Sequence, residues 1–471
     1  MALGKRAPEE KKLIWVTTWD LPESPGHPFY QKLGRLLAKA GFDPFVESLC
    51  APYYAEKLGR PSIPPGVYFR MLLVGYFEGI DSQRGIAWRC ADSRCLGAFL
   101  GMGLTEKTPD HSSLTVIRKR LPLEVHEQVF AKVLSIVREH GLIKGKTIAV
   151  DATTLEANAA MKSIVRKDTG EDWNQYLTGL AKEAGIEEPT AQDLKRFDKE
   201  RKDKKVSNRD WQSRTDPDSR VMKMKDGRTH MGYKAEHAVD LETEVVLSAR
   251  VYHGDRGDRD TVGETVIAAQ ANLVMAGAEI PVEEVVADCG YHSADTLSQL
   301  EDWGMRTYIP EQKRKKRVWQ GKPREWRESV NSNRRRVKGA RGRRLQRLRS
   351  ERVERSFAHV CDTGGARRSW IRGAIEVAKR YLIQVAARNL GLVMRKLFGI
   401  GTPRCLQDSS GLAAALYGAF YLLFWLHYGV IRLSSHLMVQ TRPHPKRSAL
   451  IHKPFAIRPR PAKNGPCSTG C

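Results

Sequence analysis

The chain has 471 residues, enough for two or three domains that each bury their own core, so stability requires neither disulfides nor a structural metal. It carries 79 Lys and Arg against 54 Asp and Glu, and the net charge of +25 favours a phosphate-bearing partner, with nucleic acid first and an anionic membrane surface second. The eight cysteines lack the paired spacing of a zinc site, and the charged first twelve residues lead into no signal-peptide apolar run. These features exclude a secreted disulfide scaffold and indicate a cytosolic protein.

Residues 1–135 are predicted to form an all-helical N-terminal domain that binds DNA. From about residue 28 onward, apolar positions recur with helical spacing, and Gly79 and Asp81 separate two such runs. The positions in question are Tyr68, Met71, Leu72, Val74 and Tyr76, followed by Ile86, Trp88 and Cys90.

The end of this domain is predicted to hold a basic helix through Ile117, with Asp110 or Ser112 as its cap. Arg118, Lys119 and Arg120 would point outward from it. A short helix, a turn and a second helix can place side chains in a DNA major groove. A helical packing domain with a solvated basic face is an equal alternative.

The second domain, residues 140–400, is predicted to be a mixed α/β unit. Short β-rich runs occur at residues 147–155, 230–239, 244–252, 283–289 and 305–310, with helical stretches at 261–276 and 294–303. Alternation of the later strands with helices favours a mixed sheet of about five strands flanked by helices over a sandwich. The polar, charged residues 162–226 are predicted to be an inserted helical or mobile segment.

A second insertion is predicted at residues 311–350, where seventeen Lys or Arg stand against three Glu. Such a run is expected not to pack a core and to follow a phosphate backbone, with a solvated loop as the alternative. The residues expected to bind DNA are Lys313, Arg314, Lys315, Lys316, Arg317, Trp319, Arg334, Arg335, Arg336 and, further on, Arg355. Trp319 and Trp326 could stack on an unpaired base, although anchoring of the loop to the protein surface is slightly favoured.

Residues 401–471 are predicted to form an apolar helix and a basic, Pro-rich tail. The run 409–431 carries no charged residue and approaches the length of a membrane span. Its Gly, Ala and His residues and its basic flanks favour a buried or partner-binding helix over a membrane anchor.

Three carboxylates are placed where a metal site could form. Asp151 and Asp288 each close an apolar strand, so their side chains should meet at the carboxyl-end rim of the sheet. Glu354 lies on a helix in which Val353 and Phe357 are spaced to bury one face, and Glu351 competes with it for the third position. Three such carboxylates can hold two Mg²⁺ or Mn²⁺ ions, which activate one oxygen and stabilise the leaving oxygen in phosphoryl chemistry.

Two other clusters are not assigned a metal. Asp255, Asp258 and Asp260 are predicted to form a loop and a helix cap before Thr261. No zinc site is predicted from the histidines, which lack paired spacing; they are His230, His237, His253 and His292.

Four motifs in order, VDATTLEANAAM, HMGYKAEHAVD, VVADCGYHSADTL and VERSFAH, resemble the DDE transposases of bacterial insertion sequences. The likeness covers most of residues 30–400, including the later ARRSWIRGAIEVAKRYLIQVAARNLGLVMRKL region. It implies an RNase H-like catalytic domain in which Asp151, Asp288 and Glu354 are the catalytic, metal-binding residues. Their separations of 137 and 66 residues fit such a core with two insertions.

The chain departs from some relatives around the glutamate. Those relatives carry a Tyr and an Arg before it and a Lys about two turns after it, where this chain has Arg347, Ser350 and Cys361. Three other arginines could replace that part of DNA binding, namely Arg349, Arg355 and Arg367.

The resemblance implies cleavage of double-stranded DNA at terminal inverted repeats and strand transfer into a target, using two Mg²⁺ or Mn²⁺ ions. It further implies a homodimer or higher oligomer on DNA, in the bacterial cytoplasm and associated with the nucleoid. The alternatives are an RNase H-like nuclease without strand transfer, a non-catalytic or decayed nucleic-acid-binding protein, and a membrane-attached basic protein.

Overall fold

The computed structural model describes residues 26–55, 62–103, 105–202, 207–224, 227–312 and 317–406. The apolar run 409–431 and the basic tail lie outside these ranges. Inside them, no helix combines the length and the apolar character that crossing a bilayer requires.

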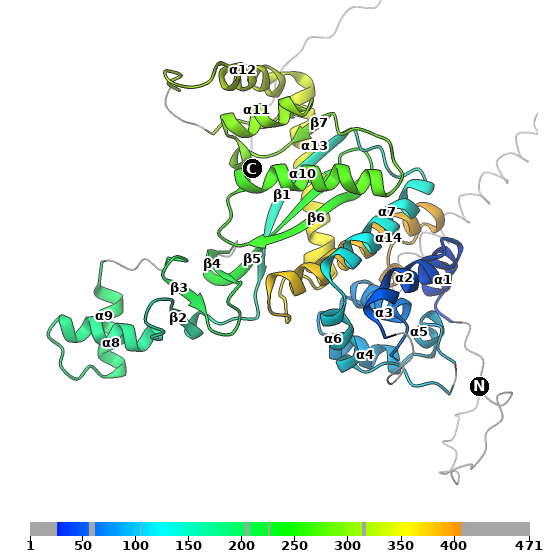
Figure 1. Cartoon of the computed structure of the whole chain (residues 1–471), viewed down its shortest axis with the longest axis horizontal. Coiled ribbons are helices and arrows are strands. Elements are labelled where there is room, and N and C mark those ends of the chain that lie inside the picture. Colours follow the sequence, from blue (N-terminus) through cyan, green and yellow to red (C-terminus); the bar gives the residue numbers. More distant parts are fainter. Residues whose placement is uncertain are drawn as a thin grey trace, which may run out of the picture. The chain divides into compact units, whose positions relative to one another are not determined.

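A six-stranded mixed sheet forms the centre of the fold (Figure 1). Its strands are β1 (Thr147–Glu156), β4 (Arg220–Lys223), β5 (Thr229–Asp240), β6 (Val246–His253), β7 (Glu284–Val286) and β8 (Arg306–Tyr308). The order is β4-β5-β1-β7-β8, with β6 also paired to β5. β5 runs antiparallel to β1 and β6, whereas β7 and β8 run parallel to β1. Five strands match the predicted runs. The sixth, β4, lies in the predicted insertion and forms by pairing with the first residues of β5.

Helices cover both faces of this sheet. They are α10 (Asp258–Met275), α11 (Ala294–Asp302), α12 (Arg324–Lys338), α13 (Ala340–Phe357) and α14 (Ala374–Phe398). Thr261 of α10 donates to Glu236 of β5, whereas Ser356 of α13 bonds to His237, the next residue of that strand. Because successive strand side chains point to opposite faces, α10 and α13 lie on opposite faces, in front of and behind the sheet in Figure 1.

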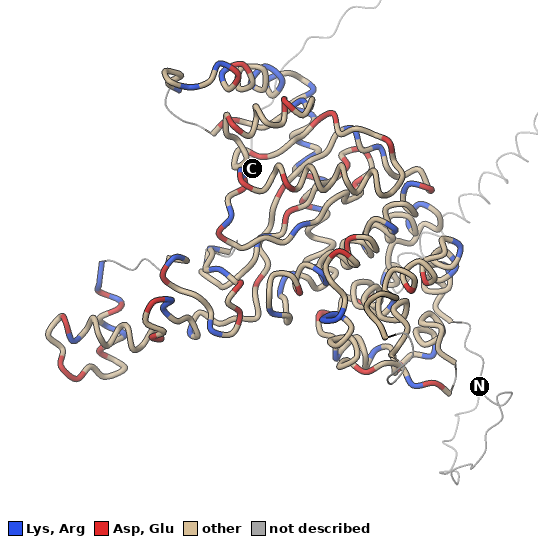
Figure 2. The backbone as a smooth tube through the Cα atoms, viewed as in Figure 1, with Lys and Arg blue, Asp and Glu red and all other residues tan. Residues whose placement is uncertain are grey.

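The expectation that residues 311–350 pack no core is wrong. Most of this stretch forms α12 and the first part of α13, and Val330 and Leu345 are buried. The Asn333 side chain is also buried, accepting from the Ile309 N–H at 3.0 Å and donating to its carbonyl at 2.7 Å. The high charge of this stretch is misleading, because a narrow stripe of buried side chains is enough to dock a helix. Figure 2 shows the charged residues along α12.

Within residues 26–55, 62–103 and 105–135 the N-terminal region is all-helical, as predicted. Its helices are α1 (Pro28–Lys39), α2 (Phe42–Cys50), α3 (Pro65–Glu78), α4 (Gln83–Ala91), α5 (Arg94–Phe99), α6 (His111–Arg120) and α7 (Leu123–Glu139). α3 is buried from Gly66 to Phe77, and it ends at Gly79, whose φ of 67° suits glycine. This helix therefore forms the centre of the helical region.

Only part of the prediction for α6 is confirmed. Asp110 caps the helix, its carboxylate accepting from the Ser112 N–H at 2.9 Å. The outward placement of Arg118 is wrong, because its guanidinium is buried and pairs with Glu376 of α14 at 2.7 Å. Lys119 and Arg120 are exposed, so the basic face of α6 is smaller than the sequence indicates.

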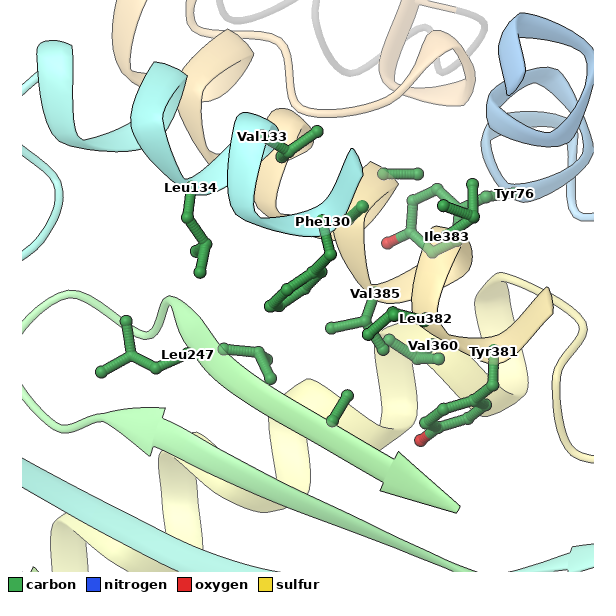
Figure 3. Packing of buried hydrophobic residues seen from close by; sticks show 14 of the residues in the cluster. Tyr76, Phe130, Val133, Leu134, Leu247, Val360, Tyr381, Leu382, Ile383 and Val385 are labelled. Atoms are coloured by element: carbon green, nitrogen blue, oxygen red, sulfur yellow. The ribbon is translucent and has the colours of Figure 1, made fainter. Parts of the chain in front are cut away.

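α7 and α14 join the helical region to the sheet (Figure 3). Phe130 of α7 is fully buried, with Leu382 and Val385 of α14 and Leu247 of β6 among its neighbours in the cluster. The long, mostly buried α14 therefore packs against helices from the N-terminal region and against β6 at the same time.

Residues 162–202 and 207–224 of the predicted insertion are folded. Besides β4 they hold α8 (Trp173–Glu183), α9 (Ala191–Glu200) and a two-stranded sheet of β2 (Ile164–Arg166) and β3 (Trp211–Ser213). Trp173 and Tyr176 of α8 each lie against Trp211 of β3, with ring centroids 5.1 and 5.2 Å apart. The segment thus has a small aromatic core of its own.

His126 on α7 should make stability depend on pH. Its ring lies between Tyr68 Oη at 3.2 Å and the Pro122 carbonyl at 3.0 Å, and burial lowers its pKa from 6.5 to about 4. The nearby Lys379 and Arg118 also lower this pKa, whereas the Pro122 carbonyl and Glu376 raise it. The folded state therefore resists the proton that the unfolded chain takes up, and stability falls as pH drops from 6.5 towards 4.

At pH 5 the expected loss from this residue is about 2 kcal/mol, since each pKa unit corresponds to about 1.4 kcal/mol. Urea unfolding at pH 7 and pH 5 measures it, with His126→Gln as the variant that lacks the titrating ring. An equal pH dependence in both proteins would contradict this assignment.

Candidate active site

Asp151 and Asp288 lie on neighbouring parallel strands. The register of β1 and β7 pairs Ala149 with Val286, and each aspartate comes two residues later along its strand direction. Asp288 caps a short helical turn, η4 (Cys289–Tyr291), where its Oδ1 accepts from the Gly290 N–H at 2.8 Å. The expectation that Asp151 closes its strand is wrong, because β1 continues to Glu156 and stays paired with β5. Asp151 instead lies just past the residues of β1 that pair with β7, and Asp288 lies just past the end of β7, so both carboxylates lie at the rim where β7 ends.

The environment of Asp151 is crowded and charged. Burial raises its pKa from 3.8 to about 6; Arg349 and the Ala152 N–H oppose this rise, and Asp288 and Asp258 add to it. Arg349 of α13 holds the carboxylate, with Nη1 2.5 Å from Oδ2. Asp151 thus needs a cationic partner to remain charged, and Arg349 provides one.

The third predicted carboxylate lies apart from this pair. Glu354 is exposed on α13, five residues after Arg349, and its Oε1 accepts from Ser350 Oγ at 3.3 Å. Glu351 pairs with Arg355 at 2.6 Å. Across the described ranges, no three His, Cys, Asp or Glu side chains are gathered closely enough to hold a metal ion. The structure therefore brings together two of the three residues.

A fourth carboxylate, Asp258, lies next to Asp288. The prediction that this acidic cluster caps a helix is wrong, since Gly257 is the cap residue of α10 and no side chain caps it. Asp258 instead lies in the first turn and pairs with Lys234 at 2.7 Å, while Asp255 pairs with Arg220 at 3.4 Å. The sequence offered one weak signal for a carboxylate near Asp288, namely an Asp at the start of the helix that follows β6.

The basic residues expected to bind DNA differ in their surroundings. Lys313, Arg314, Lys315 and Lys316 lie outside the described residues. Arg317 and Arg334 pair with Glu311, Arg336 with Glu301, and Arg355 with Glu244 and Glu351. The exposed Arg335 donates to Ser332 Oγ at 3.3 Å. Several of these charges are therefore balanced within the chain.

The two tryptophans lie against the protein. Trp319 is half-buried and packs against the hydrophobic core, with the Arg317 guanidinium 5.3 Å from its ring centroid. Trp326 is also half-buried, with Lys322 Nζ 5.6 Å from its ring. For Trp319, these contacts favour a role in anchoring the loop.

The three arginines considered as substitutes for the relatives' motif all have partners in the chain. Arg349 holds Asp151, Arg355 pairs with two glutamates, and Arg367 reaches Thr153 Oγ1 at 3.0 Å and Asp362 at 2.9 Å. Cys361 is buried in the wide helical turn η5 (Ala358–Thr363), so its side chain is not placed to meet DNA.

The rim suits a hard divalent cation. Its donors are carboxylate oxygens, the ligands that Mg²⁺ prefers. Asp151 and Asp288 are therefore suitable ligands for the divalent ions expected from the sequence.

In this sheet β4 and β6 are antiparallel to β5, β5 is antiparallel to β1, and β7 and β8 run parallel to β1, which makes a mixed α/β domain with Asp151 and Asp288 at the rim where β7 ends. Two family models match the chain. "Transposase domain (DUF772)" matches residues 21–120, and "Transposase DDE domain" matches residues 144–390. The chain belongs to the DDE transposases, and its catalytic domain is RNase H-like. Searches of curated proteins and of solved structures found no match.

Proposed function

We propose that this transposase cleaves DNA at the terminal inverted repeats of an insertion sequence and transfers the freed strand to a target. Asp151, Asp288 and Glu354 are its catalytic residues and hold two Mg²⁺ or Mn²⁺ ions. The observation that carries the proposal is the placement of Asp151 and Asp288 on adjacent parallel strands of a DDE domain.

Each residue has a distinct task in this mechanism. When bound, the divalent ions stabilise charge on the attacking and leaving oxygens of the phosphodiester. Arg349 keeps the carboxylate of Asp151 ionised, and the Gly290 N–H orients that of Asp288. Glu354 supplies the third carboxylate from α13, with Ser350 as its neighbour. No side chain becomes covalently attached to DNA, so the ions and the carboxylates carry the reaction.

The partners follow from the same chemistry. The enzyme binds double-stranded DNA, and joining two element ends requires two active sites, so we expect a homodimer or a higher oligomer on DNA. Such a protein acts in the bacterial cytoplasm, in association with the nucleoid.

Incubation of the purified chain with a labelled element end and a target plasmid, with Mg²⁺ or Mn²⁺, tests the proposal. Nicked ends and joined products are expected. Nicking without joining would indicate an RNase H-like nuclease, and binding without nicking would indicate a decayed, non-catalytic protein.

Arg344 and Arg347, on the exposed side of α13, are expected to contact DNA phosphates. Among the described residues, neither has an acidic partner within ion-pair distance. Because each phosphate contact releases counterions, the double change Arg344→Gln and Arg347→Gln should reduce the slope of log affinity against log salt by about 2.

Fluorescence anisotropy over a salt series measures this slope. Arg334→Gln is the matched control, since Glu311 already balances the charge of Arg334 at 2.7 Å. An unchanged slope in the double variant would place the DNA elsewhere on the chain.

A further inference from the structure

A buried ion network lies between β5 and the start of α10. Lys234 is 5% exposed and Glu236 is fully buried, and the Lys234 ammonium lies 3.2 Å from Glu236 Oε1. Lys234 also donates to Thr261 Oγ1 at 2.7 Å, and Tyr291 donates its hydroxyl to Glu236 Oε1 at 2.8 Å. These bonds fix the ammonium in one position.

That ammonium also holds Asp258. Lys234 Nζ lies 2.7 Å from Asp258 Oδ1, so one oxygen of this carboxylate is fixed from the buried side. The Asp258 side chain is 38% exposed, which leaves it accessible to a ligand. Glu236 already balances the charge of Lys234, so the carboxylate of Asp258 is not required to neutralise the network.

The other oxygen of Asp258 faces the proposed active site. A Cβ on Gly290 would lie 2.8 Å from Asp258 Oδ2 and 3.0 Å from Asp288 Oδ1, so both oxygens border one small space. Any residue larger than glycine at position 290 would place carbon between them.

We propose that Asp258 is a fourth carboxylate of the active site, binding a divalent ion together with Asp288, and that Lys234 is the residue that positions it. The inference rests on the proposed function. Asp258 Oδ1 is held by Lys234, which leaves Oδ2 as the oxygen available beside Asp288.

Binding of Mn²⁺ to the full chain, followed by the electron paramagnetic resonance signal of the free ion, tests this without requiring turnover. Asp258→Asn keeps the size of the side chain but removes its charge, and we expect Mn²⁺ affinity to fall about tenfold to a hundredfold. Gly290→Ala should also weaken Mn²⁺ binding, because its methyl group would displace the Asp258 carboxylate.

Asp260→Asn is the matched control. Asp260 lies in the same first turn of α10 and shares its helix dipole, but it is exposed and is expected to leave Mn²⁺ affinity unchanged. If Asp258→Asn binds Mn²⁺ as well as Asp260→Asn does, while Asp151→Asn binds it weakly, the inference is overturned and the proposed function stands. If the folded wild-type chain binds no Mn²⁺, both fail.

The role of Lys234 is tested by combining changes. Lys234→Met should lower Mn²⁺ affinity, and adding Asp258→Asn should cause no further loss, because Lys234 acts through Asp258. Lys234→Met should lose thermal stability in either case, because the buried Glu236 loses its partner. A purely structural role would instead give losses of Mn²⁺ affinity that add, and that result would overturn the assignment.

Discussion

Replacing Asp151 by asparagine is expected to lower the rate of metal-dependent DNA cleavage by about a thousandfold or more. Losing one carboxylate from a two-ion site removes about 4 kcal/mol of transition-state stabilisation, and each 1.4 kcal/mol corresponds to a factor of ten in rate. Asp288→Asn should have an effect of similar size, because both side chains serve the same ions. Single-turnover cleavage of a labelled element end measures the rate.

The controls for this prediction are chosen on the same elements. Glu156→Gln removes a carboxylate from the last residue of β1 and is expected to cleave at the wild-type rate. DNA binding should be retained in all variants, since the aspartates are not expected to contact phosphates without metal. Full activity of Asp151→Asn would refute the assignment of the active site.

Glu354→Gln and Glu351→Gln form a second matched pair on α13. Both residues are exposed, but Glu351 is held by Arg355 at 2.6 Å, whereas Glu354 lies beside Ser350. We expect loss of cleavage for Glu354→Gln and near wild-type cleavage for Glu351→Gln. The reverse result would move the third carboxylate to Glu351.

Phe130→Ala is expected to give the largest loss of stability, about 3–5 kcal/mol in the free energy of unfolding. The ring is fully buried in the cluster that α7, α14 and β6 share (Figure 3), so its removal leaves a cavity where the helical region meets the sheet. Denaturation by urea, followed by circular dichroism, measures the loss.

Phe398→Ala makes the same change at the exposed end of α14, where the ring is 37% exposed and contacts Lys32. Its expected cost is about 1 kcal/mol or less. Equal costs for the two variants would mean that the junction of α7, α14 and β6 does not carry the stability assigned to it.

Patterns within short stretches of sequence were sufficient to predict the framework. Short β-rich runs marked β1, β5, β6, β7 and β8, and helical spacing marked the N-terminal helices, because both signals depend on residues close together in the chain. The apolar runs before Asp151 and Asp288 predicted that both lie at one rim of the sheet, but they did not show that β1 continues past Asp151 to Glu156, because that extension depends on pairing with β5.

The partners of individual charges could not be predicted in this way. Arg118, expected outside, binds Glu376, which lies 258 positions later, and Arg349, considered for DNA, binds Asp151, which lies 198 positions earlier. α12 and the first part of α13 pack against the protein although their residues are mostly charged, because the few apolar side chains meet one surface only after folding.

The sequence by itself determined the overall charge, the positions of five strands along the chain and the apolar runs that lead to Asp151 and Asp288, since composition and local patterns are read without knowledge of the fold. Tertiary structure alone decided that Lys234 fixes Asp258 beside Asp288 and that Arg349 compensates Asp151. Those pairings join segments that are distant along the chain. Their energies depend on burial and on the distance between opposite charges, which only the folded packing sets.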